Sequence, residues 1–157
     1  MPAEPRITLE LAEFLESGLA IVVGVRDGDL NPDGAAAWAV EVDEERSRFT
    51  VYLHEIAAAE LLRFLRSHAE IAINLDQPTS HRACQAKGVF VGTRAARDDE
   101  RELVDRQVEG FRKDLAEIGF PPALTAAWRT WPCTALDVQV TQLFEQTPGP
   151  GTGGPLK

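Results

Sequence analysis

Short segments with the character of β-strands recur along this chain, and they constrain its fold more than any other feature of the sequence. Residues 19–25 form an almost unbroken apolar run, rich in branched side chains and too short for a buried helix, which predicts a buried strand. The turn signal Asp27-Gly28 ends this run. Further segments alternate apolar and polar residues with a period of two, as half-exposed strands do. These segments are residues 36–42, 49–54, 71–75, 81–94 and 135–144.

Three segments show helical periodicity instead. Thr8 is placed to cap a short amphipathic helix that ends at Gly18, a residue that tolerates the left-handed conformation. Residues 57–67 carry leucines at helical spacing, with charged residues opposite. Asp98 is placed to cap a third helix, which Gly119 stops. The chain therefore combines several strands with a few helices between them.

These elements predict a mainly β (α+β) fold in which six antiparallel strands form a small barrel with peripheral helices. No internal repeat is visible, and helices inserted between hairpins do not give the regular alternation of a parallel sheet. Gly88 and Gly92 interrupt the long strand at residues 81–94 and indicate bends where the sheet curls. With 157 residues, of which 44% are hydrophobic, the chain suits one domain over residues 1–145. The tail, residues 146–157, is rich in proline and glycine and cannot form a core of its own.

The charge balance argues against two classes of partner. A net charge of −9 is the wrong sign for a surface that neutralises the phosphates of nucleic acid or of anionic lipid. The first residues are polar, and no apolar run reaches the roughly 20 residues that span a bilayer. We therefore expect a cytoplasmic protein in which Cys84 and Cys133 are reduced.

Several apparent motifs lack the context that their chemistry needs. Gly149, Gly151 and Gly154 have the spacing of a dinucleotide fingerprint, but only three residues follow the last glycine where a helix is required. The histidines and cysteines do not repeat at ligand spacing, so we expect no metal site. No serine lies in a Gly-x-Ser-x-Gly elbow, and hydrolase chemistry is not supported.

The segment from Ser80 to Gly88 carries the clearest candidate site. Strand alternation places His81, Gln85 and Lys87 on one face of the predicted strand and Cys84 and Ala86 on the other. A strip of hydrogen-bond donors on the outside of a barrel could bind an electron-rich heterocycle or a phosphate. A solvated strand face would show the same pattern, and the sequence alone favours neither interpretation.

In its order of elements and in the motif His-x-x-x-Gln-x-Lys-Gly, which begins at His81, the chain resembles the pyridoxamine 5'-phosphate oxidase-like, FMN-binding split-barrel family. The resemblance runs from about residue 21 to residue 88, and the ending Phe-Glu-Gln-Thr-Pro-Gly-Pro-Gly after the last strand extends it to an uncharacterised branch. It implies a six-stranded split β-barrel, a two-fold dimer, and FMN in a groove between subunits, where the flavin exchanges hydride or electrons.

The resemblance also implies positions for the cofactor site. Gln85 and Lys87 match the polar strand that borders the flavin in this family. Trp38 and His54 lie on the two preceding strands, which flank the same groove. For Trp38, packing in a core or at an interface is the more common role of a tryptophan.

The chain departs from the family where the FMN phosphate is held. The family's oxidases carry Arg and Lys on the second strand and a Ser-Arg-Lys-like cluster at the start of the helix after the third strand. Here residues 34–38 read Gly-Ala-Ala-Ala-Trp, and residues 57–60 read Ala-Ala-Ala-Glu. The amide groups at the start of this helix attract a phosphate. The negative charge of Glu60 opposes phosphate binding, both directly and through its interaction with the helix dipole.

Two functions are consistent with these residues. The first is an FMN-binding, pyridoxamine 5'-phosphate oxidase-like oxidoreductase of unknown substrate, as Gln85 and Lys87 favour. The alternative is a non-catalytic binding module that has lost tight FMN binding and holds haem or another planar ligand, as the missing cations favour. A homodimer is expected in both cases, because so small a barrel cannot bury three Trp, seven Phe and the irregular, proline-rich residues 120–132.

Overall fold

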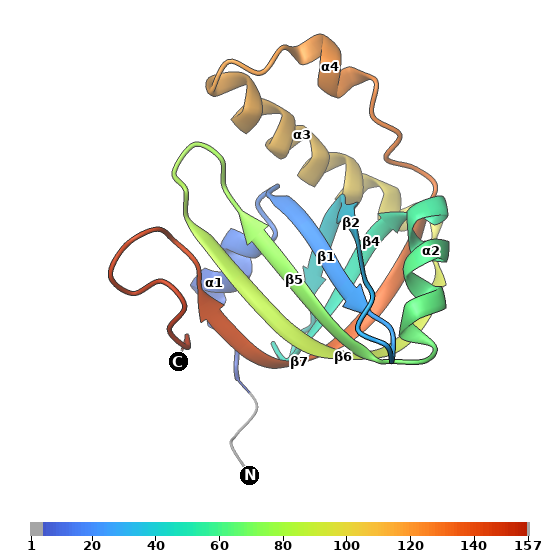
Figure 1. Ribbon diagram of the computed structural model, residues 1–157. Coiled ribbons are helices and arrows are strands. Elements are labelled where there is room, and N and C mark those ends of the chain that lie inside the picture. The colour runs from blue at the N-terminus through green and yellow to red at the C-terminus, as the bar shows by residue number, and fades with distance from the viewer. Residues whose placement is uncertain (1–4, 157) are drawn as a thin grey trace.

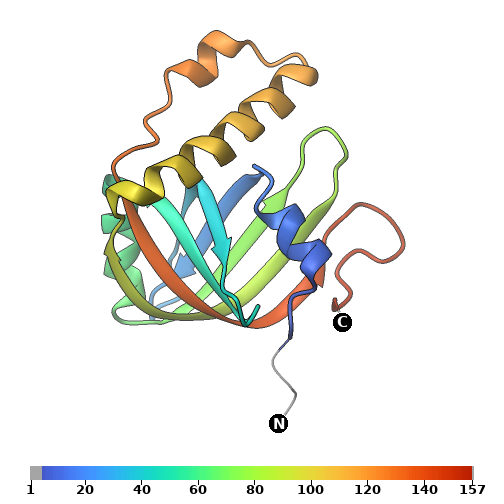
Figure 2. The same cartoon turned by 180° about the vertical axis from the view of Figure 1, so that it is seen from behind.

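The computed structural model describes residues 5–156, which form one curled antiparallel sheet with helices at its margins (Figure 1). Seven strands lie in the order β2-β1-β5-β6-β7-β4-β3, which confirms the mainly β, split-barrel prediction. The strands are β1 (Ala20–Arg26), β2 (Pro32–Ala37), β3 (Ala39–Val42), β4 (Arg48–His54), β5 (Glu70–Asp76), β6 (Ala83–Ala95) and β7 (Cys133–Glu145). The helices are α1 (Leu9–Leu15), α2 (Glu55–Leu65), the 3₁₀ turn η1 (Asp98–Glu100), α3 (Arg101–Glu117) and α4 (Pro122–Ala126). Figure 2 shows the same barrel from behind, with α3 crossing one end of it.

The strand predicted for residues 36–42 is in fact two strands, because the chain changes its pairing partner at Trp38. β2 pairs with β1 up to Ala37, whereas β3 pairs with β4 from Ala39 onward. Between them, the Trp38 N–H donates to the Tyr52 carbonyl oxygen at 2.8 Å. The sheet therefore has seven strands where six were predicted, and its two edge strands are joined at this residue.

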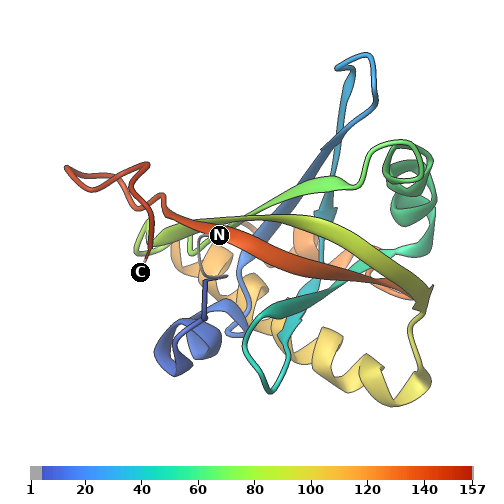
Figure 3. The same ribbon diagram turned by 90° about the horizontal axis from the view of Figure 1, so that it is seen from below.

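β6 bends at two points that its glycines mark. Its pairing register with β7 shifts between Lys87 and Gly88 and again between Phe90 and Gly92. A Cβ at Gly88 would overlap the Gln139 carbonyl oxygen, so a side chain cannot be accommodated at this bulge. The prediction that these glycines mark bends is confirmed, and Figure 3 shows β6 and β7 sweeping across the molecule in a strong curve.

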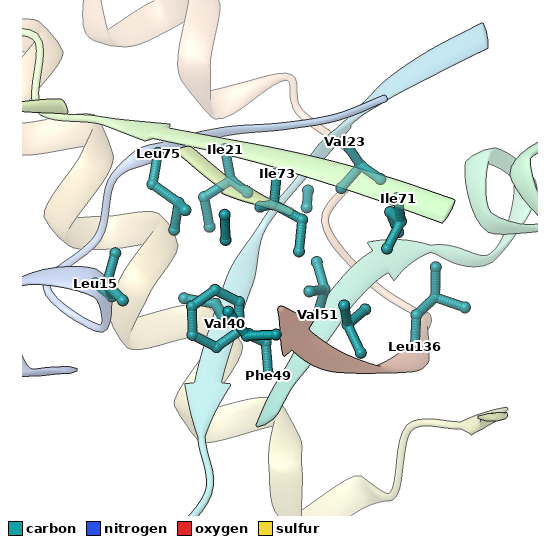
Figure 4. Packing of buried hydrophobic residues seen from close by; sticks show 14 of the residues in the cluster. Leu15, Ile21, Val23, Val40, Phe49, Val51, Ile71, Ile73, Leu75 and Leu136 are labelled. Carbon is teal, nitrogen blue, oxygen red and sulfur yellow. The ribbon is translucent and has the colours of Figure 1, made fainter. Parts of the chain in front are cut away.

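The core fills the concave side of the sheet. In Figure 4, the side chains of Ile21 on β1 and Ile73 on β5 face those of Phe49 and Val51 on β4 across the interior. All four are at most 2% exposed. Leu15 of α1 is also fully buried and joins the same cluster. The opposite face of β1, β5 and β6 is consequently left at the surface of the barrel.

The N-terminal cap of α1 is as predicted, whereas the cap predicted before α3 is not. The Thr8 hydroxyl accepts a hydrogen bond from the Leu11 N–H at 3.1 Å, which confirms the cap of α1. The cap predicted at Asp98 is wrong, because this residue lies inside η1 and Arg97 precedes the turn. The Glu100 carboxylate accepts from the Arg97 N–H at 2.7 Å and supplies the missing cap.

The segment predicted to be irregular, residues 120–132, contains the short helix α4. Pro122 occupies its first turn, where the absent proline N–H costs nothing. Trp128, after α4, lies with its ring centroid 5.4 Å from that of Phe111 on α3 and so ties the segment to that helix.

The tail returns to the barrel after β7. The Gln146 N–H donates to the Ala83 carbonyl oxygen at 2.9 Å, and the Leu156 N–H donates to the Leu143 carbonyl oxygen at 2.9 Å. Cys84 and Cys133 are both buried and free, as expected. Within residues 5–156, no helix is long and apolar enough to cross a membrane, and no cluster of His, Cys, Asp and Glu is arranged to hold a metal ion.

Candidate functional site

A cavity of about 510 Å³ lies on the outer face of the sheet, where five strands contribute to its lining. Gly24 of β1, Ala72 of β5 and Lys87 of β6 lie opposite one another in a row across these strands. Because the glycine and the alanine carry almost no side chain, the row forms a hollow; a Cβ on Gly24 would meet nothing within 4 Å. We call it the outer-face cavity; its lining includes Gly24, Arg26, Asp33, Glu70, Ala72 and Lys87.

One rim of this cavity is an ion-pair network centred on Glu70. Its Oε2 accepts from Arg26 Nη2 at 3.0 Å and lies 3.0 Å from His68 Nε2. These hydrogen bonds, first that of His68 and then that of Arg26, hold the pKa of Glu70 below its usual value. Glu70 is therefore a carboxylate at neutral pH, which its exposure to water also favours.

The other charged groups of the lining are less constrained. Lys87 is exposed, and its Nζ lies 5.4 Å from the centroid of the Phe144 ring on β7. Asp33 on β2 accepts a hydrogen bond from the Gly34 N–H at 2.9 Å. The arrangement offers hydrogen-bond donors and acceptors around a floor of small residues, which suits a flat polar ligand.

The three site residues predicted to share one strand face lie in different surroundings in the structure. Lys87 lines the outer-face cavity. Gln85 lies two residues away on the same face, opposite Asn74 of β5, and is half-buried outside the lining. The placement of His81 on this strand is wrong: β6 begins at Ala83, and His81 lies in the preceding loop, exposed and with a φ of 61°.

Trp38 and His54 do not reach the outer-face cavity either. The Trp38 ring lies 5.2 Å from that of Trp128 and packs in a second apolar cluster between the barrel and α3. His54 caps α2, with Nδ1 accepting from the Ile56 N–H at 3.3 Å. Both residues have structural roles in the chain as described.

Sequence reasoning missed Gly24, Arg26 and Glu70. A glycine inside an apolar strand is a signal for close approach of a ligand, and Gly24 within residues 19–25 carries it. The pairing of Arg26 with Glu70 joins residues 44 positions apart, and no local pattern reveals it.

A second, smaller hollow of about 130 Å³ lies between α1, β7 and the tail. Its lining includes Arg82, whose guanidinium lies 4.1 Å from the centroid of the Phe14 ring and 3.6 Å from a Glu10 oxygen. This hollow is too small for a flavin or a porphyrin.

Comparison with solved structures shows the class of fold: a split barrel shared by flavin-binding and pyridoxamine 5'-phosphate oxidase-like proteins. One similar structure is HupZ of Group A Streptococcus, with a TM-score of 0.55 and 12% identity over 94% of this chain and 99% of that one. A candidate pyridoxamine 5'-phosphate oxidase of Lactobacillus delbrueckii gives a TM-score of 0.54 and 15% identity, covering 88% and 93% of the two chains. An FMN-binding protein of Syntrophomonas wolfei gives 0.52 and 13%, covering 87% and 84%. No family model and no curated protein matches the sequence.

Proposed function

We propose that the outer-face cavity binds the isoalloxazine ring of a flavin, and that the protein is an FMN-binding, pyridoxamine 5'-phosphate oxidase-like oxidoreductase. The observation that carries this proposal is the hollow over Gly24 and Ala72 with Lys87 at its side. Its volume of about 510 Å³ is that of a cofactor site. The flavin would supply hydride or electron exchange, and the protein would bind and orient it. The substrate is left open.

Lys87 is the residue proposed to contact the ring. An ammonium group donates hydrogen bonds to the electron-rich carbonyl and nitrogen atoms of a heterocycle. Lys87 directly precedes the register shift at Gly88, where β6 approaches β7 closely. Gln85 on the same face is expected to border the ligand once the cavity is covered.

We further propose that a second copy of the chain covers this face, as a cytoplasmic homodimer. Three valines stand exposed around the cavity on the outer face: Val22 at 52%, Val89 at 39% and Val91 at 49%. A monomer would leave this apolar surface in water, whereas an isologous dimer would bury it and close the cavity. The two free buried thiols suit the reducing cytoplasm.

The alternative is a non-catalytic module that holds haem or another planar ligand in the same cavity. It is supported by the absence of basic residues at the two stretches that grip phosphate in the family, residues 34–38 and 57–60. Glu60, in the second stretch, is an exposed carboxylate paired with Arg63 at 3.2 Å.

Visible absorption spectra of the purified protein, recorded before and after addition of FMN or haem, separate these functions. A bound flavin gives a yellow protein and quenched flavin fluorescence, and haem gives a Soret band. No spectral change with either ligand would contradict both.

Gly24→Val tests the location of the site. The new side chain projects into open space, so we expect the fold to survive, and β-branched residues favour strands. The side chain occupies the floor of the cavity, however, and flavin affinity should fall at least about tenfold, because a ring cannot share that space with it. Titration of flavin fluorescence and thermal unfolding measure the two effects.

Gly92→Val is the matched control for this substitution. Gly92 also lies in a strand, a Cβ there meets nothing within 4 Å, and it is outside the cavity lining. If Gly24→Val bound flavin like the wild type and like Gly92→Val, the site would lie elsewhere.

A further inference from the structure

The outer-face cavity carries as many acidic as basic side chains. Arg26 and Lys87 are the basic residues of its lining, and Asp33 and Glu70 are the acidic ones. Arg26 is engaged by Glu70 at 3.0 Å. Among residues 5–156, Lys87 has no carboxylate partner, so it is the one lining cation available to a ligand.

The two carboxylates limit what can bind beside them. A carboxylate accepts hydrogen bonds and cannot donate them, and a phosphate at neutral pH has little proton to donate and carries nearly two negative charges. Asp33 and Glu70 would therefore repel a phosphate and offer its oxygens no donor. A hydroxyl group both donates and accepts, so it can bond to these carboxylates as well as to the Arg26 guanidinium.

The basic residues that could offset this repulsion are absent from the usual places. Residues 34–38, at the end of β2 and just after it, contain none, and α2 begins with Glu55 and continues to Glu60 without a cation. If Lys87 binds the heterocycle, as the proposed function requires, no unpaired cation of the lining is left for a phosphate.

We propose that the outer-face cavity recognises a planar heterocycle with an uncharged polyhydroxy chain, and that it binds riboflavin at least as tightly as FMN. The ribityl hydroxyls contact the rim formed by Arg26, Asp33 and Glu70, and the phosphate of FMN contributes nothing to affinity. This inference rests on the proposed flavin site and defines the ligand class of that site.

Titration of riboflavin and of FMN into the wild type and into Asp33→Asn/Glu70→Gln tests it. Asn and Gln keep the acceptor oxygens that bond to Gly34, Arg26 and His68, so the fold should survive. The wild type should bind riboflavin at least as tightly as FMN. The double variant should favour FMN by about tenfold or more, because two charges that repel the phosphate are gone. The control Glu45→Gln/Glu117→Gln changes the net charge equally at exposed sites outside the lining and should keep the wild-type ratio.

The possible results distinguish a failure of this inference from a failure of the proposed flavin site. FMN binding about threefold or more tighter than riboflavin in the wild type would overturn this inference and leave the flavin site standing. An equal FMN preference in the double variant and in its control would also overturn it. Failure of the wild type to bind either ligand would overturn the proposed function, and this inference with it.

Discussion

Lys87 combines exposure, a place in the cavity lining and a positive charge that no carboxylate neutralises in the described chain. Lys87→Ala should therefore weaken flavin binding by roughly 1.5–3 kcal/mol, the range of a charge-assisted hydrogen bond. Stability should change little, because the side chain projects into solvent. Fluorescence titration gives the affinity, and urea denaturation gives the free energy of unfolding.

Arg82→Ala supplies the control for this substitution. Arg82 lies outside the outer-face cavity, stacked over Phe14 and close to Glu10, so its loss should lower stability by up to about 1 kcal/mol and leave flavin binding unchanged. Equal affinities in the wild type and both variants would remove β6 from the site.

At single positions, strand alternation predicted which side chains of β6 face outward. Cys84 and Ala86 are buried while Lys87 is exposed, as expected. The prediction for His81 was wrong because alternation holds only within a strand. His81 precedes β6 and has a left-handed backbone conformation, so its side chain does not follow the alternation of that strand. The Arg26–Glu70 pair depends on strand register, which the local sequence does not contain.

At the scale of elements, Glu100 joins the start of α3 to the barrel. Its carboxylate, only 8% exposed, accepts from two Arg94 nitrogens at 2.6 and 2.8 Å and from the Tyr52 hydroxyl at 3.0 Å. These bonds, chiefly that of Arg94, lower the pKa of Glu100 from 4.5 to about 2. Because the folded value is the lower one, the stabilisation is present above about pH 4.5 and is lost as the pH falls toward 2.

Glu100→Gln should accordingly cost about 3 kcal/mol of unfolding free energy at pH 7, and the cost should shrink as the pH falls below 4.5. Urea denaturation of both proteins between pH 3 and 7 measures this difference. Asp99→Asn, which changes a neighbouring carboxylate that is 74% exposed, should have almost no effect. A cost that stayed constant with pH would show that the Glu100 charge is not what joins these elements.

The helices and strands were largely predictable from the sequence, and the exceptions arise from contacts between elements that are distant in the chain. Each strand and each long helix has its own period in the sequence, which local side-chain chemistry imposes. The break at Trp38 has no local signal, because it arises when the chain leaves β1 for β4. Gln107 likewise lies buried within α3 although it is polar, because its amide pairs with the Val40 N–H and C=O at the edge of β3 at 3.0 and 2.8 Å.

For the whole molecule, the position of the exposed apolar residues bears on assembly more than their total area does. Exposed valines on the outer face of β1 and β6 surround a cavity whose polar groups remain in water in a single chain. An antiparallel barrel could be inferred from the pattern of the sequence, with six of its strands expected where seven are present, but this patch could not, because it depends on which strands become neighbours.

The last prediction concerns assembly through this face. We expect light scattering at micromolar concentration to give twice the 17.2 kDa chain mass. Val22→Asp/Val91→Asp should yield monomers, because burying two unpaired carboxylates costs far more than an interface gains from two valines. Neither valine lines the cavity, so a loss of flavin affinity in this variant would report the loss of the covering partner. Ile56→Asp, at a 64% exposed position on α2, is the control and should remain dimeric with unchanged affinity. A monomeric wild type would contradict the dimer, and a dimeric Val22→Asp/Val91→Asp would place the interface on another face.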